Sequence, residues 1–194
     1  MIFRLIDETP LHSGFLTVSR LQVETDEGVV GREVEDHGPA ASVLAYDPER
    51  RVAMLVEVLR LGPLKAGADP RVLEAAAGMI DDGETPEAAA RREAQEETGL
   101  ELGDLEPLGA FWSAPGVSSE RVWLYLGPYG EADRTSTGGG KPGEQEGLEP
   151  QEHPLDELWS RLESGDLPDM KTVLLLQALR LRRPELFEQR SSRP

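Results

Sequence analysis

The feature that most constrains this chain is a short acidic helix, predicted between a threonine-proline pair and a glycine. Thr85-Pro86 supplies a capping residue and a proline at the first helical position, and Gly99 stands where helices commonly end. Near that end the helix carries Glu93, Glu96 and Glu97. Residues three and four apart share one helical face, so these carboxylates repel one another. The pattern therefore requires a positive group close to them.

Two interpretations of this acidic face are open from the residues alone. One is an ordinary solvated surface helix, which is the usual meaning of such a charge run. The other is a divalent cation. The chain has no cysteine, which excludes disulfides, thiolate zinc sites and a cysteine nucleophile. Carboxylate and carbonyl oxygens suit Mg²⁺ or Mn²⁺, and Arg92 is placed to pair with Glu96 one turn away.

The charge balance narrows the class of partner. The 194 residues include 37 Asp and Glu against 20 Lys and Arg, which gives a formal net charge of −17. Such a chain repels nucleic-acid backbones and anionic membrane surfaces, so neither is an expected partner. Charged residues interrupt the first eight positions, and no later stretch is long enough to span a bilayer. The sequence predicts a cytoplasmic protein.

Strand patterns precede the acidic helix. Residues 15–34 alternate in the strand sense around a glycine turn and predict an antiparallel hairpin. Residues 40–46 and 52–59 are apolar runs separated by turn residues, so they are expected to pair as a second hairpin. Two more strands are predicted at residues 105–112 and 122–126, and Pro107 indicates an edge or a bulge.

The C-terminal part combines a polar segment with two helices. Residues 129–147 are rich in Gly, Ser, Thr and Glu and predict a mobile loop. Apolar residues at helical spacing then predict helices at residues 155–162 and 173–181. Strands followed by helices indicate a layered α/β domain.

The acidic helix belongs to a longer pattern that is specific. It reads glycine, five residues, glutamate, seven residues, Arg-Glu, an apolar residue, any residue, Glu-Glu, any residue, glycine and an apolar residue. This resembles the signature of the Nudix hydrolases, and each fixed position is matched: Gly78, Glu84, Arg92, Glu93, Glu96, Glu97, Gly99 and Leu100. Ala94 is smaller than the aliphatic residue usual at its place. The resemblance extends over residues 14–181 and implies an α/β fold, the Nudix αβα sandwich with a mixed sheet and an N-terminal antiparallel hairpin region.

The resemblance also implies an activity and a metal site. Nudix hydrolases cleave a nucleoside diphosphate linked to another group, and bound cations neutralise the diphosphate and lower the pKa of the attacking water. Glu93 and Glu97 are the expected metal ligands, with the main-chain carbonyl of Ala77 as a further one. Glu96 is expected to share the metal or to contact it through a water molecule. Glu96 and Arg92 are both assigned as catalytic residues. The expected cofactor is Mg²⁺, with Mn²⁺ as the alternative.

Within the family, the spacing resembles the ADP-ribose pyrophosphatase branch. Pro115 follows Gly99 by 16 residues, and Ala114-Pro115-Gly116 with Glu120 resembles the substrate loop of that branch, although a Pro-Gly pair alone is simply a turn. Arg32-Glu33 and Arg60 also resemble its substrate-binding positions. Arg60 could hold a phosphate through two hydrogen bonds, the alternative being an ordinary surface arginine.

The same branch carries its general base on an acidic loop and forms dimers. The resemblance assigns Glu144 as the base and Glu146 as a metal contact, whereas a charged, glycine-rich loop is otherwise simply disordered. It also predicts a homodimer, with residues 1–36 as the N-terminal strand region for dimerisation and residues 37–194 as the hydrolase domain. Phe15 or Leu16 then lines the nucleobase pocket of the partner, core packing being the simpler alternative for either residue.

Three functions follow from the resemblance. The first is hydrolysis of ADP-ribose to AMP and ribose 5-phosphate. The second is hydrolysis of GDP-mannose, because residues 138–140 and 171–176 resemble the GDP-mannose hydrolases of this branch. The third is a sensor that binds a nucleotide sugar without cleaving it, but such domains often lose a signature glutamate and this chain retains them all. In each case the partner is a small nucleotide sugar.

Overall fold

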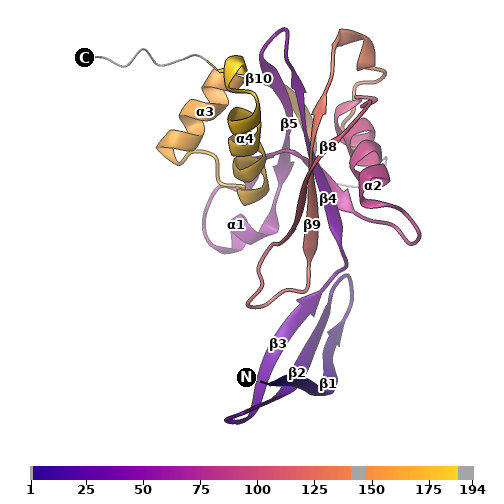
Figure 1. The fold of residues 1–194 in the computed structure, drawn as a ribbon, viewed down its shortest axis with the longest axis vertical. Coiled ribbons are helices and arrows are strands. Elements are labelled where there is room, and N and C mark those ends of the chain that lie inside the picture. Colours follow the sequence, from indigo (N-terminus) through magenta and orange to yellow (C-terminus); the bar gives the residue numbers. More distant parts are fainter. Residues whose placement is uncertain (1, 141–146, 188–194) are drawn as a thin grey trace. The chain divides into compact units, whose positions relative to one another are not determined.

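The computed structural model describes residues 2–140 and 147–187 of the chain, which divides into two units (Figure 1). Unit 1 contains Met1–Ala40 and Ala110–Val122, and unit 2 contains Ala41–Gly109 and Trp123–Pro194. No helix in the described part of the chain is long and apolar enough to cross a membrane.

Unit 1 is built on a three-stranded antiparallel sheet in the order β1-β2-β3, formed by β1 (Phe3–Ser13), β2 (Thr17–Thr25) and β3 (Gly28–Asp36). The β2–β3 pairing confirms the hairpin predicted for residues 15–34. The Thr25 hydroxyl closes the turn by donating to the carbonyl of Gly28 at 2.8 Å. Gly28 has a φ of +124°, which a side chain would disfavour.

Strand β1 was not expected as a separate strand, because charged residues and Pro10 interrupt its apolar pattern. The structure places it at the edge of the sheet, where a proline costs no ladder hydrogen bond. Its pairing with β2 shifts register between Leu5 and Asp7 and again between Pro10 and His12. Such irregularities allow a strand to remain extended although its apolar pattern is interrupted.

The sheet of unit 2 has the order β10-β5-β4-β9-β8, with β6 paired to β5 and β7 paired to β4. Its strands are β4 (Ala40–Asp47), β5 (Val52–Leu59), β6 (Arg71–Glu74), β7 (Ala76–Met79), β8 (Glu106–Trp112), β9 (Arg121–Pro128) and β10 (Glu149–Pro154). The antiparallel β4–β5 pair confirms the second predicted hairpin. Strand β8, which contains Pro107, ends the strand order, as an edge strand should.

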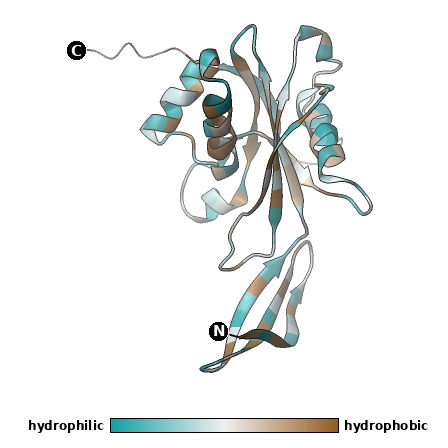
Figure 2. Ribbon diagram, in the orientation of Figure 1, coloured by the Kyte–Doolittle hydropathy of each residue, from teal (hydrophilic) through white to brown (hydrophobic). Residues whose placement is uncertain are grey.

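Helices cover both faces of this sheet (Figure 1). Helix α2 lies on one face, and α1, α3 and α4 lie on the other, which confirms the predicted αβα sandwich. The helices are α1 (Leu61–Lys65), α2 (Pro86–Glu93), α3 (Leu155–Ser164) and α4 (Met170–Arg182), with short helical turns η1 (Ala94–Thr98), η2 (Glu131–Asp133) and η3 (Pro184–Leu186). Figure 2 shows hydrophobic residues concentrated in the central strands of this sheet and in α4.

Small residues set the packing of α2 on the sheet. Ala89, Ala90 and Ala94 are fully buried against strand residues that include Val43 and Met54. Alanine has no long side chain to hold the helix away, so the helix packs closely on the sheet. Ala94, which departs from the usual aliphatic residue of the signature, is therefore a packed core residue.

The acidic helix is not regular to its end. A single helix is predicted up to Gly99, but α2 gives way at Ala94 to the π-helical turn η1, whose wider hydrogen-bonding pattern propensity does not reveal. Helix α4 also begins earlier than predicted, at Met170, because Asp169 caps it.

Residues 129–147 are predicted as a mobile loop, and their described part contains the helical turn η2 and several backbone hydrogen bonds to other segments. The backbone N–H groups of Thr135 and Ser136 donate to the carbonyl of Gly99 at 2.9 and 3.3 Å, and that of Glu101 donates to Asp133 at 2.8 Å. These hydrogen bonds join two polar segments, a pairing that composition alone cannot indicate. The described part of this segment therefore makes long-range backbone hydrogen bonds that the predicted loop did not include.

Candidate active site

The acidic face forms at the end of α2 and in η1. The Thr85 side chain accepts a hydrogen bond from the Ala88 N–H and starts the helix, as predicted. At the other end Gly99 adopts a left-handed φ of +77° and ends it. Between these limits the helical spacing places Glu93, Glu96 and Glu97 close together in the last two turns.

Arg92 compensates this negative charge. Its guanidinium donates to both carboxylate oxygens of Glu84 at 3.0 Å, to Glu96 at 3.2 Å and also to Glu93. It further donates to the main-chain carbonyl of Met79 at 2.8 Å. The hydrogen bonds that Arg92 donates to Glu84 are the main reason that the pKa of Arg92 lies well above its usual value. The predicted Arg92–Glu96 contact is thus one part of a larger cluster.

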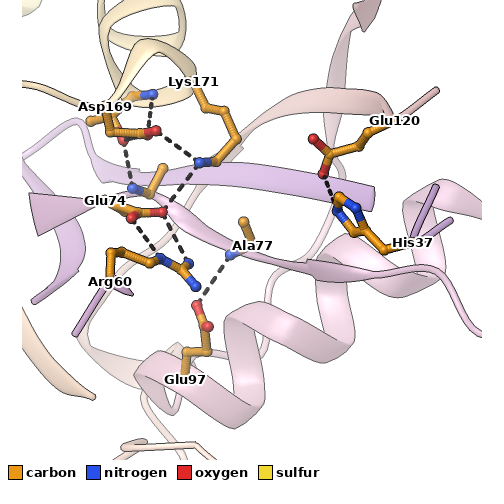
Figure 3. A network of polar contacts seen from close by, with 10 residues as sticks. His37, Arg60, Glu74, Ala77, Glu97, Glu120, Asp169 and Lys171 are labelled. Carbon is orange, nitrogen blue, oxygen red and sulfur yellow. Dashed lines mark hydrogen bonds and ion pairs between the residues drawn. The ribbon is translucent and has the colours of Figure 1, made fainter. Parts of the chain in front are cut away.

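Strand β7 lies against the carboxylates. Glu97 is only 6% exposed and accepts a hydrogen bond from the Ala77 N–H at 3.1 Å (Figure 3). The next residue, Gly78, leaves room for Glu93, because a methyl group there would overlap the Glu93 carboxylate. Glu93 and Glu97 therefore face the backbone segment whose Ala77 carbonyl is the predicted third ligand.

The donor atoms at this helix end fit a hard divalent cation. Two glutamates and a main-chain carbonyl supply the oxygen types that Mg²⁺ prefers. Within residues 2–140 and 147–187, no group of three His, Cys, Asp or Glu side chains could hold a metal ion. Mg²⁺ commonly uses one or two carboxylates and completes its shell with water and substrate phosphate. The donor set matches that manner of binding.

A second polar cluster surrounds the buried carboxylate of Glu74 (Figure 3). Arg60 donates to both of its oxygens, at 2.8 and 3.1 Å, and Lys171 donates to it at 3.2 Å. Lys171 also donates to Asp169 at 2.8 Å. Burial alone would lower the pKa of Lys171, but the charges of Asp169 and Glu74 raise it. Two cations and two carboxylates are therefore held together.

This cluster fixes the strand that leads to Ala77. Asp169 caps α4 by accepting from the backbone N–H and the hydroxyl of Thr172 at 2.9 and 2.7 Å. The Thr172 hydroxyl in turn accepts from the Ala75 N–H at 2.7 Å. The chain from Glu74 to Ala77 is thus tied to α4 at one end and to Glu97 at the other.

In unit 1, Glu120 belongs to a cluster around His37. The two ring nitrogens of His37 lie 2.9 Å from Glu35 and 3.3 Å from Glu120, the second contact being drawn in Figure 3. Phe15 is 85% exposed and stacks on His37 with a centroid separation of 6.4 Å. Burial alone would lower the pKa of His37, but the two carboxylates raise it.

The predicted substrate loop is also in unit 1 and forms a tight turn. The backbone N–H groups of Val117 and Ser118 donate to the Ala114 carbonyl at 2.9 and 2.8 Å, which places Pro115-Gly116 at the tip. Glu35 joins this loop to β3 through a 2.9 Å hydrogen bond from its N–H to Val117. Arg32-Glu33 is an exposed pair on β3, opposite β2.

A family model described as the NUDIX domain matches residues 36–176, well over half of the chain. This chain belongs to the Nudix family. Its signature residues are the ones that build the acidic face on α2 and η1 and the loop before them.

Curated Nudix relatives agree with this assignment. The chain is 38% identical over 152 residues to a GDP-mannose pyrophosphatase of Cronobacter sakazakii, covering 78% of each chain. It is 36% identical over 149 residues to a protein of the same name from Citrobacter koseri, covering 76% of each. It is 33% identical over 151 residues to one from Escherichia coli, covering 77% of this chain and 78% of the relative.

The Nudix site residues predicted from the sequence separate into three groups. Ala77, Arg92, Glu93, Glu96 and Glu97 come together in unit 2, where Arg60 is bound to Glu74. The remaining predicted substrate-binding residues, Phe15, Arg32, Glu33, Ala114, Pro115, Gly116 and Glu120, belong to unit 1. The predicted base Glu144 and metal contact Glu146 lie outside the described residues.

Sequence reasoning did not single out Glu74, Asp169 or His37. Glu74 stands within the otherwise apolar run of residues 72–77, and a lone carboxylate in such a run indicates a buried ion pair. Asp169 precedes the predicted α4 pattern, and an aspartate in that position indicates a helix cap. His37 carries no such signal, because two of its partners, Phe15 and Glu120, are distant in the chain.

Proposed function

We propose that this chain is a metal-dependent hydrolase that cleaves the diphosphate of a nucleotide sugar, with GDP-mannose as the favoured substrate and GMP and mannose 1-phosphate as products. The observation that carries the proposal is the complete Nudix signature, whose Glu93 and Glu97 face the backbone of Ala77 and Gly78. The names of the relatives favour GDP-mannose, as do residues 138–140 and 171–176.

The metal site of the proposal uses oxygen ligands only. Glu93, Glu97 and the Ala77 carbonyl hold Mg²⁺, which when bound neutralises diphosphate charge and acidifies a water molecule. Arg92 keeps neighbouring carboxylates in place, and Glu96 shares the ion or holds a water. Mn²⁺ has the same ligand preference and serves as a probe.

The remaining groups bind substrate and move a proton. Arg60 holds a phosphate group in this proposal, since a guanidinium forms paired hydrogen bonds with phosphate oxygens. Glu144 accepts a proton from the attacking water, and Glu146 contacts the metal. The residues of unit 1 that resemble the substrate loop and β3 contacts, namely Phe15, Arg32, Glu33, Ala114, Pro115, Gly116 and Glu120, contact the nucleoside or the sugar.

A homodimer is part of the proposal. Strand β1 is exposed along its entire length, and Leu5, Val23 and Val30 form an apolar row across the three paired strands. No apolar side chain is fully buried within β1 to β3, all of which lie in the described part of the chain. A three-stranded sheet normally needs a covering surface, and a second copy of this chain supplies it.

A second substrate, ADP-ribose, is favoured by the place of Pro115, which follows Gly99 at the spacing of the ADP-ribose pyrophosphatase branch. The tight turn at residues 114–118 keeps this proline at the loop tip. Cleavage of ADP-ribose by the same chemistry yields AMP and ribose 5-phosphate.

The test is a comparison of kcat/KM with Mg²⁺ for GDP-mannose, ADP-ribose, ADP-glucose and diadenosine polyphosphates. We expect GDP-mannose to have the highest value and Glu93→Gln to abolish turnover of every substrate. A higher value for ADP-ribose would transfer the proposal to that substrate. Binding of nucleotide sugars without formation of any product would indicate that the chain is a sensor and not an enzyme.

A further inference from the structure

The last carbonyls of the acidic helix are bound by a glycine segment that is distant in the sequence. The backbone N–H of Gly139 donates to the carbonyl of Glu97 at 2.8 Å, and that of Gly140 donates to the carbonyl of Glu96 at 2.9 Å. The final carbonyls of a helix have no partner within it. Residues 138–140 therefore cap the helix from a distant part of the chain. The two capped carbonyls belong to Glu96 and Glu97, whose side chains are part of the acidic face.

Steric fit shows how close this contact is. Gly138 has a φ of +67°, and a methyl group there would overlap the backbone of Glu97 and Thr98. Gly99 has a φ of +77°, and a methyl group there would overlap the backbone of Ser136. Backbone packs directly on backbone from both sides, so only glycine fits at either position.

The contact lies where the helix is least regular. Glu96 and Glu97 belong to the π-helical turn η1, a rare conformation that occurs often at functional sites. Holding the carbonyl of a residue restricts its peptide plane and hence the direction in which its side chain leaves the backbone. Hydrogen bonds to two consecutive carbonyls thereby restrict the carboxylates of Glu96 and Glu97.

We propose that the segment Gly138–Gly140 positions Glu96 and Glu97 for metal binding, in addition to capping the helix. The inference rests on the metal site under Proposed function and adds three positioning residues to it. Outer contacts that orient metal ligands typically change metal affinity by about 10- to 100-fold when they are removed. A cap with a purely structural role would change stability alone.

The test compares Gly138→Ala with Gly165→Ala. Gly165 is a matched control, because it also ends a helix, has a left-handed φ of +83° and has open space where a methyl group would stand. Mn²⁺ titrations followed by electron paramagnetic resonance give the dissociation constant, and thermal unfolding gives Tm. We expect Gly138→Ala to weaken Mn²⁺ binding by about tenfold or more, and Gly165→Ala to lower Tm without changing the Mn²⁺ dissociation constant.

Kinetics provide a second readout. Gly138→Ala should lower kcat at limiting Mn²⁺, and a higher Mn²⁺ concentration should restore much of the loss, while KM for GDP-mannose changes little. If Gly138→Ala does not fold, Gly139→Ala takes its place, because a side chain at its φ of +101° is strained but meets no close contact. We expect that variant also to weaken Mn²⁺ binding.

Unchanged Mn²⁺ affinity in a folded Gly138→Ala or Gly139→Ala variant would overturn the inference. The segment Gly138–Gly140 would then only cap the helix. The Glu93→Gln variant separates this outcome from failure of the proposed function. If the wild type binds Mn²⁺ and Glu93→Gln does not, the metal site stands whatever the glycine variants do. If the wild type binds no Mn²⁺, both the metal site and the inference fail.

Discussion

Arg92 shows how one residue can compensate an entire acidic face. Its guanidinium donates to Glu84, Glu93 and Glu96 and to a main-chain carbonyl. A lysine has a compact ammonium group that cannot reach these acceptors in the same planar arrangement. The residue type, and not only its charge, is therefore needed at this position.

Arg92→Lys should lower the free energy of unfolding by about 1–3 kcal/mol, because partly buried acceptors lose their donors. The measurement is urea denaturation in a metal-free buffer. Arg161→Lys is the control, since Arg161 forms an exposed pair with Glu157, and its effect should stay within about 0.5 kcal/mol. Equal losses in the two variants would show that Arg92 contributes no more than a surface charge.

His37 should titrate above its ordinary pKa of 6.5, because Glu35 and Glu120 hold its protonated form. A group whose pKa is raised on folding stabilises the fold fully below its unfolded pKa. That stabilisation is lost as the pH rises through the higher, folded value. NMR titration of the ring measures this pKa, and Glu120→Gln should lower it, whereas Glu33→Gln should not. A ring pKa unaffected by Glu120→Gln would contradict the contact.

At the scale of elements, residues at the start of α4 stabilise the helix and also bind the polar cluster next to the candidate site. Asp169 caps the helix and binds Lys171, and Lys171 binds Glu74, which also binds Arg60. The residue that caps α4 is thus part of the same hydrogen-bonded cluster that holds Arg60 and Lys171 near the strand of Ala77.

Asp169→Ala should reduce the free energy of unfolding at neutral pH by about 1–2 kcal/mol, the usual cost of a lost helix cap. Burial alone would raise the pKa of Asp169, but Lys171 and Thr172 lower it below its ordinary 3.8. The stabilisation is therefore present above pH 3.8 and is lost as the pH falls through the lower, folded value. Denaturation curves across this range should converge for the wild type and the variant. A constant difference down to the acid limit would contradict this assignment.

Glu74→Gln should weaken substrate binding, because Arg60 and Lys171 lose the carboxylate that holds both. We expect KM for the nucleotide sugar to rise about tenfold, roughly 1.4 kcal/mol of binding, while kcat changes less. Glu57→Gln, in the neighbouring strand β5, is the control. A fall in kcat with unchanged KM would show that Glu74 acts through the metal site instead.

The sequence predicted those elements whose limits are set by local chemistry. Thr85 and Gly99 bound the acidic helix as predicted, and the apolar runs on either side of the turn at Asp47 pair as predicted. The π-helical turn was not predicted, because helix propensity does not reveal its wider hydrogen-bonding pattern. The contact of the glycine segment with the helix end was not predicted, because it depends on hydrogen bonds between residues about 40 positions apart. The network of Glu74 was missed for the same reason, since Lys171 and Asp169 are distant in the chain.

At the scale of the whole molecule, the predicted site residues belong to two units. The signature identified the acidic face of α2 and η1 in unit 2, because its spacing alone places the glutamates on one helix end. Residues such as Phe15 and Glu120 of unit 1 were named by resemblance, and their contacts with His37 could not be read from the sequence. In the proposed function, substrate preference depends on such contacts, which no motif specifies.

The proposed homodimer gives a prediction of assembly. Sedimentation equilibrium should give a mass near twice that of the 21.3 kDa chain. Leu5→Glu, which adds a charge to the exposed apolar row of the β1–β3 sheet, should shift the equilibrium to monomers. Arg4→Glu is the control, because Arg4 pairs with Glu24 and does not share that row. A wild-type protein that sediments as a monomer would contradict the proposed homodimer.

The measurement that tests the central claim most directly is ³¹P NMR of GDP-mannose incubated with the purified protein. With Mg²⁺ we predict that the diphosphate signals disappear and two phosphate monoester signals, of GMP and mannose 1-phosphate, replace them. Chelation of the metal or Glu93→Gln should leave the diphosphate intact. An unchanged diphosphate with wild-type protein and Mg²⁺, with ADP-ribose equally unchanged, would contradict the account.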